Sequence, residues 1–572
     1  MTCFVAGFEV QSMIFMHYTP SFQCQDANES ITWVSRATYE LISNASNMDF
    51  AQFNNTTPPQ QCWGFYINPN SGEATRFQCS RWAYDTTQMK RTVVTQFNLV
   101  CERKWWVPSM EAVYLFFSAV GYLVAFLGDT LGRRLPFLAF SAWGILVCLA
   151  TPFANSIPLL VFLRGCRGMS TALSYLGIQI VSELVPVSRR EVYGNLYWTL
   201  WAFGYIVCAG TAVLLRDWVK LRLWYCAFLS VYLVYPVFVC ESPRWLCMRG
   251  EKKKAINILR RIAKWNNAKL PEDYFVKADL TLEYEYTQST KPITSITDWI
   301  PGDKLIFNTS SESLELESPM STGGGSEFYN RTDKCFDIIK FPNLRKYTLV
   351  FCIAHSAITM VYFGLITDSF FATENIFLNV FLMGLMELPT SFAGWGVSVY
   401  FGRRIATSSL LVLTGITVVI VKLSSSSFPI VSTVAALVCK FAISVVYCVS
   451  DLYITEVYPT TVRVAGFFTI ISVAGVFSAI APFINNLTEV HILIPCTIYS
   501  IASISGAITV HRYLPETRNC PLAQSVSEAE QLIRGKEAEW IIRKRHENCA
   551  NPRNCQPNSV VGSEANVEAK EN

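Results

Sequence analysis

The stretch GDTLGRRLPF, residues 128–137, places one acid and two arginines between two long apolar runs. A similar cluster returns as FGRR at 401–404, so that Gly132-Arg133-Arg134 is repeated 270 residues later as Gly402-Arg403-Arg404. The same Gly-Arg-Arg sequence at two places between apolar runs suggests that a larger unit is repeated along the chain.

Two further motifs recur in the same order and at nearly the same offset. ELVPVSRR, with its E-x-x-P-x-x-x-R pattern, returns after 273 residues as EVYPTTVR, and ESPRWL returns after 275 residues as ETRNCPL. Three motifs that recur in the same order and at nearly the same spacing are hard to produce by chance. We infer that the chain consists of two homologous halves.

The composition indicates a membrane protein. Of the 572 residues, 51% are hydrophobic and 16% are charged, whereas soluble domains carry about 25% charged residues. The apolar residues form runs of ~17–22 residues, the length of a helix that crosses a bilayer. The number of such runs disfavours the alternative of buried helices in a soluble core. The net charge of +4 is too small to indicate a nucleic acid partner.

We predict an all-α fold with twelve spans in two pseudo-symmetric six-helix halves, with the lipid bilayer as the surrounding partner. The predicted spans are 2–18, 107–127, 136–154, 157–180, 192–214, 222–240, 347–367, 375–398, 404–422, 428–449, 463–484 and 491–513. The corresponding regions are a first helix (1–18), a loop (19–106), the rest of the N-terminal half (107–240), a linker (241–346), the C-terminal half (347–513) and a tail (514–572).

Charge and cysteine content predict the orientation. The repeated motifs fall at turns on one side, and their arginines place that side, the linker and the tail in the cytosol. The linker holds the amphipathic KKKAINILRRIAKWN (252–266) and the low-complexity 310–327, which we expect to be disordered, as we do the tail. The 19–106 loop carries four cysteines and four glycosylation sequons, which predict two disulfides of open pairing on an outer, plasma-membrane face. These residues are Cys24, Cys62, Cys79, Cys101, Asn28, Asn44, Asn54 and Asn55.

The charged turns suggest a gate. We expect their acids and arginines to pair between neighbouring helices only when the cytosolic ends of the halves are closed, which would latch the outward-facing state. For any single arginine the alternative is a topology signal without further role. The predicted gating residues are Asp129, Arg133, Arg134, Arg164, Glu183, Arg190, Glu241, Arg244, Arg403, Arg404, Glu456, Arg463 and Glu516.

The motifs also carry a family resemblance. GDTLGRR, ESPRWL and PETRNCPL resemble signatures of the major facilitator superfamily. TPSFQC (19–24), TVVTQFNLVCERKW (92–105), AINILRRIAKWN and ITEVYPTTVR (454–463) resemble the organic ion transporters of solute carrier family 22. The resemblance runs to about residue 522 and implies alternating access around a central site. The chain departs from the family at Ala125 and Thr130, and its start inside the first span predicts that Met1 is an internal start or a truncated gene model.

Ionisable residues deep in the spans are candidates for a substrate site, because a charge in the bilayer is costly. Glu387 and Lys440 lie about mid-span, and Asp451 follows Lys440 on the same helix face at ~16 Å, too far to pair. His355 is a weaker candidate, because a lone histidine is more often a packing residue.

The family resemblance adds to this site. It implies an acid at Glu387, a base at Lys440 and cavity aromatics at Trp201 and at Tyr362 of a Tyr-x-Gly motif. Gly475 stands where the resemblance implies a charge that sorts substrates, and Thr171 and Ser174 replace a lysine and a tryptophan of the cation carriers. The charge of the substrate therefore stays open.

The sequence predicts a secondary-active or facilitative transporter of a small organic cation or carnitine-like zwitterion, with a coupling ion or a counter-substrate left open as a further partner. One alternative is a porter of organic anions or neutral solutes, favoured by Lys440. Another is a receptor or scaffold on the same fold that does not transport. We expect no enzymatic activity, no cofactor and no ATP drive, because no P-loop, metal-ligand spacing or nucleophile–base pair stands out.

Overall fold

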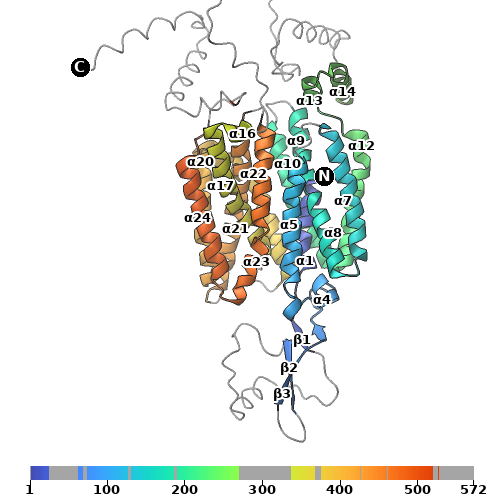
Figure 1. Cartoon of the computed structure of the whole chain (residues 1–572), viewed down its shortest axis with the longest axis vertical. Coiled ribbons are helices and arrows are strands. Elements are labelled where there is room, and N and C mark those ends of the chain that lie inside the picture. Colours follow the sequence, from blue (N-terminus) through green and yellow to red (C-terminus); the bar gives the residue numbers. More distant parts are fainter. Residues whose placement is uncertain are drawn as a thin grey trace, which may run out of the picture.

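The computed structural model describes residues 2–24, 62–67, 74–125, 131–185, 190–268, 337–367, 375–424, 427–459, 462–518 and 526. It shows a helical bundle of two side-by-side groups of helices, with a small strand-containing region at one end (Figure 1). Several predicted features lie outside the described residues, namely Asp129, Asn28, Asn44, Asn54, Asn55 and the segment 310–327. The side chains of Arg190, Arg244 and Ser174 also lie outside the described part.

The N-terminal half has six membrane-crossing segments within the described residues. They are α1 (Thr2–Met16), α5 (Trp106–Ala125), α7 (Arg134–Ala150), α8 (Ile157–Met169) with α9 (Ala172–Leu184), α10 (Arg190–Leu215), and α11 (Trp218–Leu229), which continues through the 3-10 turn Ser230–Val234 into α12 (Tyr235–Phe238). A further 3-10 turn, Thr151–Phe153, follows α7.

The C-terminal half repeats this layout. Its segments are α17 (Pro342–Thr367), α18 (Ile376–Glu387) with α19 (Thr390–Phe401), α20 (Arg403–Ser424), α21 (Pro429–Val457), α22 (Arg463–Ser478) with α23 (Ala481–Asn486), and α24 (Ile494–Tyr513). The 3-10 turn Leu487–Glu489 follows α23. Ten helices of the described chain are long and apolar enough to cross a membrane, α1 is shorter, and α8 and α9 are two pieces of one segment. The predicted layout of twelve spans in two halves is confirmed.

Local sequence signals set the helix boundaries. Proline opens α8, α21 and α24, where its missing N–H is not needed. The side chain of Asp217 accepts a hydrogen bond from the backbone N–H of Val219 at the start of α11, and Asn375 caps α18 in the same way. Pro389 falls between α18 and α19, where it interrupts the helical hydrogen bonds immediately after Glu387.

In the described part of the chain, the largest contacts between the two halves involve two pairs of segments. α5 packs against α22 and α23, and α10 packs against α18. Small residues allow these close approaches. An added Cβ at Gly475 would lie 2.9 Å from the Cβ of Ala119, and one at Gly384 would lie 2.9 Å from the Cβ of Tyr205.

One end of the bundle, here called the disulfide end, carries the small strands (Figure 1). β1 (Phe22–Cys24) pairs with β4 (Trp82–Tyr84), and β2 (Trp63–Ile67) pairs with β3 (Ala74–Gln78), both antiparallel. Two disulfides, Cys24–Cys79 and Cys62–Cys101, hold these strands, the short helix α4 (Val93–Phe97) and the 3-10 turn Cys101–Arg103 together.

The opposite end, here called the arginine end, carries Arg133, Arg134, Arg403 and Arg404. The short helices α13 (Pro243–Met248), α14 (Lys252–Trp265) and α16 (Asp337–Lys340) lie at the same end (Figure 1). The amphipathic stretch of the linker forms α14, in which Ala255 and Ile256 are buried and the lysines are exposed or partly exposed. The cysteine-bearing loop and the arginine turns therefore lie at opposite ends of the bundle.

Candidate functional site

A buried ion pair lies in the C-terminal half. The Nζ of Lys440, on α21, is 2.6 Å from Oε1 of Glu387, the last residue of α18, and both side chains are less than a tenth exposed. The same carboxylate accepts hydrogen bonds from the hydroxyl of Tyr362 at 2.8 Å and from that of Ser444 at 2.9 Å. Three donors thus compensate one buried carboxylate, which is the condition for keeping it charged in a bilayer.

Aromatic rings from both halves enclose this pair. The Nζ of Lys440 lies 3.7 Å from the ring centroid of Tyr362 and 5.9 Å from that of Tyr205, which belongs to α10 of the N-terminal half. The hydroxyls of Tyr205 and Tyr362 are 3.1 Å apart. The ring of Trp201 lies 5.9 Å from that of Tyr205, one helical turn away. The pair is therefore placed where the two halves meet.

The structure brings together four of the predicted substrate-site residues, Glu387, Lys440, Tyr362 and Trp201. Tyr205 was not predicted. Its four-residue spacing from Trp201 on one helix face is the signal that could have found it.

Asp451 belongs to a different cluster, nearer the arginine end. Its Oδ1 lies 3.9 Å from Nε2 of His355, whose Nδ1 is 3.1 Å from the hydroxyl of Ser450. Next to His355 lies Tyr447, whose hydroxyl is 3.1 Å from that of Tyr175 in the other half. The expectation that Asp451 and Lys440 do not pair agrees with this placement.

Gly475 is an inter-half contact in this structure. Its backbone packs against Ala119 of α5, where an added side chain would displace one half from the other. Thr171 also lies away from the ion pair, and its hydroxyl donates a hydrogen bond to the hydroxyl of Tyr114 at 3.1 Å. These two departures from the family pattern therefore fall on packing contacts.

The arginine turns are built in the same way in both halves. Oε1 of Glu241 accepts a hydrogen bond from the backbone N–H of Arg133 at 2.8 Å, and Oε1 of Glu516 accepts one from that of Arg403 at 2.8 Å. Arg134 and Arg404 donate their backbone N–H groups to the same two carboxylates.

The glycines of these turns are required by the carboxylates. Gly132 and Gly402 have φ angles of 92° and 82°, and an added Cβ would lie 2.4 Å and 2.6 Å from the carboxylate oxygens of Glu241 and Glu516. Glycine is favoured where φ is positive and the backbone must approach another group this closely. The repeated GRR motif therefore binds a carboxylate of its own half through backbone N–H groups.

The ion pairs at this end differ from the predicted latch. The Nε of Arg133 is 3.2 Å from Glu183, and the Nη2 of Arg403 is 2.8 Å from Glu456, so each pair joins helices of the same half. Arg463 likewise donates from Nε to the backbone oxygen of Tyr458 within its own half. Rigid-body movement of one half against the other would leave these contacts intact, so they brace each half and do not bridge the two.

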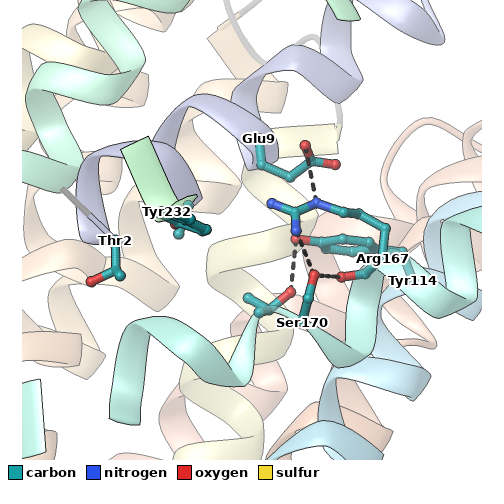
Figure 2. Close-up of a pocket in the computed structure, with 8 residues that line it drawn as sticks. Thr2, Glu9, Tyr114, Arg167, Ser170 and Tyr232 are labelled. Carbon is teal, nitrogen blue, oxygen red and sulfur yellow. Dashed lines mark hydrogen bonds and ion pairs between the residues drawn. The ribbon is translucent and has the colours of Figure 1, made fainter. Parts of the chain in front are cut away.

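Arg164, the remaining residue predicted for the gate, lies away from the arginine end. It is fully buried in the N-terminal half, where its Nη1 is 2.9 Å from Oε1 of Glu9. Arg167 and Arg222 pair with the same glutamate. This cluster was not predicted beyond Arg164, although Arg164 and Arg167 stand three residues apart in one apolar span. Figure 2 shows Arg167 beside Glu9. No group of three or more His, Cys, Asp or Glu side chains that could hold a metal is present in the described part of the chain.

The sequence is similar to known transporters over most of its length. Residues 49–299 match the family model "Sugar (and other) transporter". The beta-alanine transporter of Drosophila melanogaster is 29% identical over 463 residues, covering 79% of this chain and 68% of that protein. Solute carrier family 22 member 3 of Mus musculus is 26% identical, covering 84% and 78%. Organic cation transporter 1 of Caenorhabditis elegans is 26% identical, covering 80% and 72%.

The fold is similar to that of a solved transporter. The proton:xylose symporter XylE, bound to 6-bromo-6-deoxy-D-glucose, matches with a TM-score of 0.54 at 15% identity, covering 77% of this chain and 92% of that chain. The chain has the fold of the major facilitator superfamily, and the curated proteins that it resembles are membrane transporters. Its curated relatives include members of solute carrier family 22, which confirms the predicted resemblance, and the relatives and the fold are those of transporters and not of enzymes.

Proposed function

We propose that this transporter carries small zwitterionic organic solutes across the plasma membrane, binding them at Glu387 and Lys440. The observation that carries the proposal is the buried ion pair between these two side chains, 2.6 Å apart where the two halves meet. Buried ionisable residues in a bilayer are costly and mark substrate or ion pathways.

The pairing rule for buried charges favours a zwitterion. Removing one partner from a buried ion pair leaves the other charge uncompensated, at a cost of about 3–5 kcal/mol. A cation that bound Glu387 would displace Lys440 from its partner, and an anion that bound Lys440 would do the same to Glu387. A zwitterion presents an ammonium to Glu387 and a carboxylate to Lys440, so that no charge is left unpaired.

The aromatic walls support the same substrate class. Tyr362 and Tyr205 lie next to Lys440, with Trp201 beside Tyr205, and an ammonium over such rings gains ~0.5–2 kcal/mol per ring. The similarity to a beta-alanine transporter adds support, because that relative's name denotes a small zwitterion. An organic cation is the second candidate, favoured by Glu387 and by the relative named an organic cation transporter.

Contacts between the halves lie on both sides of the pair. Tyr175 meets Tyr447 nearer the arginine end, and Lys104 pairs with Glu489 at the disulfide end. Alternating access requires one of these contacts to open while the other stays closed. We place the arginine end in the cytosol, because cytosolic turns are rich in arginine and lysine.

An uptake panel tests the substrate class. In oocytes that express the chain, we expect saturable uptake of radiolabelled beta-alanine, at least about tenfold above that of tetraethylammonium or propionate. A tenfold change corresponds to ~1.4 kcal/mol, and each buried charge left unpaired costs more than this. Water-injected oocytes are the control. Saturable uptake of tetraethylammonium alone would establish a cation carrier instead, and binding without flux would establish a receptor.

A further inference from the structure

A second buried charge cluster lies inside the N-terminal half. Arg164 and Arg167 of α8 and Arg222 of α11 all point at Glu9 of α1. Arg164 Nη1 is 2.9 Å from Glu9 Oε1, Arg167 Nε is 3.5 Å from Oε2, and Arg222 Nη1 contacts Oε2. All four side chains are at most 7% exposed. Figure 2 shows Arg167 between Glu9 and Ser170.

The charges of this cluster do not balance. A guanidinium stays protonated in a protein, so three positive charges face one carboxylate. The nearby acid Glu111, whose Oε1 is 2.9 Å from Nδ1 of His17, supplies a second carboxylate, so three guanidinium groups outnumber two carboxylates. In the described part of the chain, every ion pair of the three arginines goes to Glu9. An excess of buried positive charge is unfavourable unless an anion compensates it.

Aromatic rings compensate part of this excess. The guanidinium of Arg164 lies 4.9 Å from the ring centroid of Tyr114, and those of Arg167 and Arg222 lie 5.4 Å and 5.5 Å from that of Tyr225. Each such contact is worth about 2 kcal/mol when desolvated. Two hydroxyls also accept hydrogen bonds from Arg167, that of Tyr225 from Nη2 and that of Ser170 from Nη1.

Several donors of the cluster have no acceptor. The Nε atoms of Arg164, Arg167 and Arg222, and the Nη2 of Arg164, are buried without a hydrogen-bond partner among the described residues. Such orphaned donors are uncommon, and each calls for a bound water or ion.

A small cavity adjoins the cluster. Arg167, Ser170 and Tyr114 line one side and Thr2 and Tyr232 the other, with Glu9 at the margin (Figure 2), and Thr171 also lines the cavity. The space is about 10 Å³, room for the centre of one water-sized sphere. The lining is rich in guanidinium and hydroxyl groups, which can donate to an acceptor, and the cavity is too small for a whole organic solute.

We propose that this cavity binds one small monovalent anion, chloride, at a site separate from Glu387 and Lys440. A water would satisfy a donor but not the excess charge. Arg167 lines the cavity, and the charges of Arg164 and Arg222 nearby add to a positive potential that disfavours a cation. The site is lined by residues of α1 and α5, and both helices contact the C-terminal half. An anion bound there therefore stabilises helices at the interface between the two halves. The inference does not rest on the proposed substrate.

Thermal unfolding of the purified full chain in detergent tests the site without any transport assay. The probes are sodium chloride and sodium acetate, each compared with sodium gluconate at equal ionic strength. We expect a saturable rise of about 2–4 °C in the unfolding midpoint, because an anion that binds only the folded state stabilises it by mass action. We expect the response to chloride at a concentration at least tenfold lower than the response to acetate, because acetate is larger than the cavity. An equal or stronger response to acetate would contradict the chloride site.

Variants separate specific binding from a general salt effect. We expect Arg167→Gln to lose the anion-dependent rise in the unfolding midpoint. Arg167→Lys keeps the charge and should need at least tenfold more anion for the same rise. It also provides a measurement if Arg167→Gln does not fold. Arg260→Gln, on the exposed face of α14, is the matched control and should respond as the wild type does. The proposal is overturned if chloride and acetate act no differently from gluconate, or if the Arg167 variants respond as the wild type does.

Discussion

Replacing Glu387 with glutamine lowers the saturable uptake of beta-alanine by about 10²–10³-fold, and replacing Lys440 with glutamine has an effect of similar size. Either change leaves the other charge buried without its partner, at a cost of about 3–5 kcal/mol, and removes one of the two groups that hold the substrate. The measurement is the initial uptake rate over a range of substrate concentrations, normalised to the amount of protein at the cell surface.

Exchanging the two charges gives a sharper test of the pair. The double variant Glu387→Lys with Lys440→Glu restores an ion pair, so we expect it to reach the surface and to recover more uptake than either single variant. Glu251→Gln, which removes an exposed partner of Lys254, is the control and should keep wild-type uptake. Unchanged kinetics in both single variants would remove Glu387 and Lys440 from the substrate site.

Replacing Glu9 with glutamine destabilises the whole protein. The change removes the carboxylate to which Arg164, Arg167 and Arg222 pair, and we expect the free energy of unfolding to fall by at least about 3–5 kcal/mol. The loss should appear as aggregation in fluorescence-detected size-exclusion chromatography and as reduced delivery to the cell surface.

Glu9→Asp keeps the charge and should retain part of the stability, whereas Glu251→Gln again serves as an exposed control. An unfolding midpoint of Glu9→Gln within 1 °C of the wild type would show that the arginines do not depend on this carboxylate. That outcome would also contradict the charge count on which the anion site rests.

The fold was predictable because its signals are local or repeated. The apolar runs fix the number of spans, and the offset between Gly132 and Gly402 reveals the two halves before any contact is known. The structure adds the physical reason for the repeat, because the carboxylates of Glu241 and Glu516 each pack against a glycine whose φ is positive. The sequence showed that these residues recur together, but not that the contacts lie within each half.

The candidate site was predictable only in part. Glu387 and Lys440 are conspicuous, because each is an isolated charge in an apolar span. Tyr205 was missed because an aromatic in a span is usually a packing residue, and its four-residue spacing from Trp201 was the one local signal. Its contact with Tyr362 across the interface is a tertiary property. Gly475 attracted attention by its place in a motif, but its surroundings show a packing role against Ala119.

The cluster around Glu9 was missed because its members are far apart in the chain. Glu9 and Arg222 are separated by 213 residues, and each lies in or near a predicted span without a nearby partner in sequence. Arg222 stood at the start of a span, where an arginine is usually a topology signal. Which arginine reaches the carboxylate depends on how α1, α8 and α11 pack, and this is a tertiary property.

Counterflow in proteoliposomes measures whether the chain moves a zwitterion across a membrane. Vesicles that contain the purified chain are loaded with unlabelled beta-alanine and diluted into a trace of the labelled compound. A zwitterion carrier that alternates between two faces predicts a transient, saturable accumulation of label that depends on the internal load and is absent in Glu387→Gln vesicles. Binding of the label without accumulation in wild-type vesicles would contradict the account, because a protein that binds but does not move its ligand is a receptor and not a carrier.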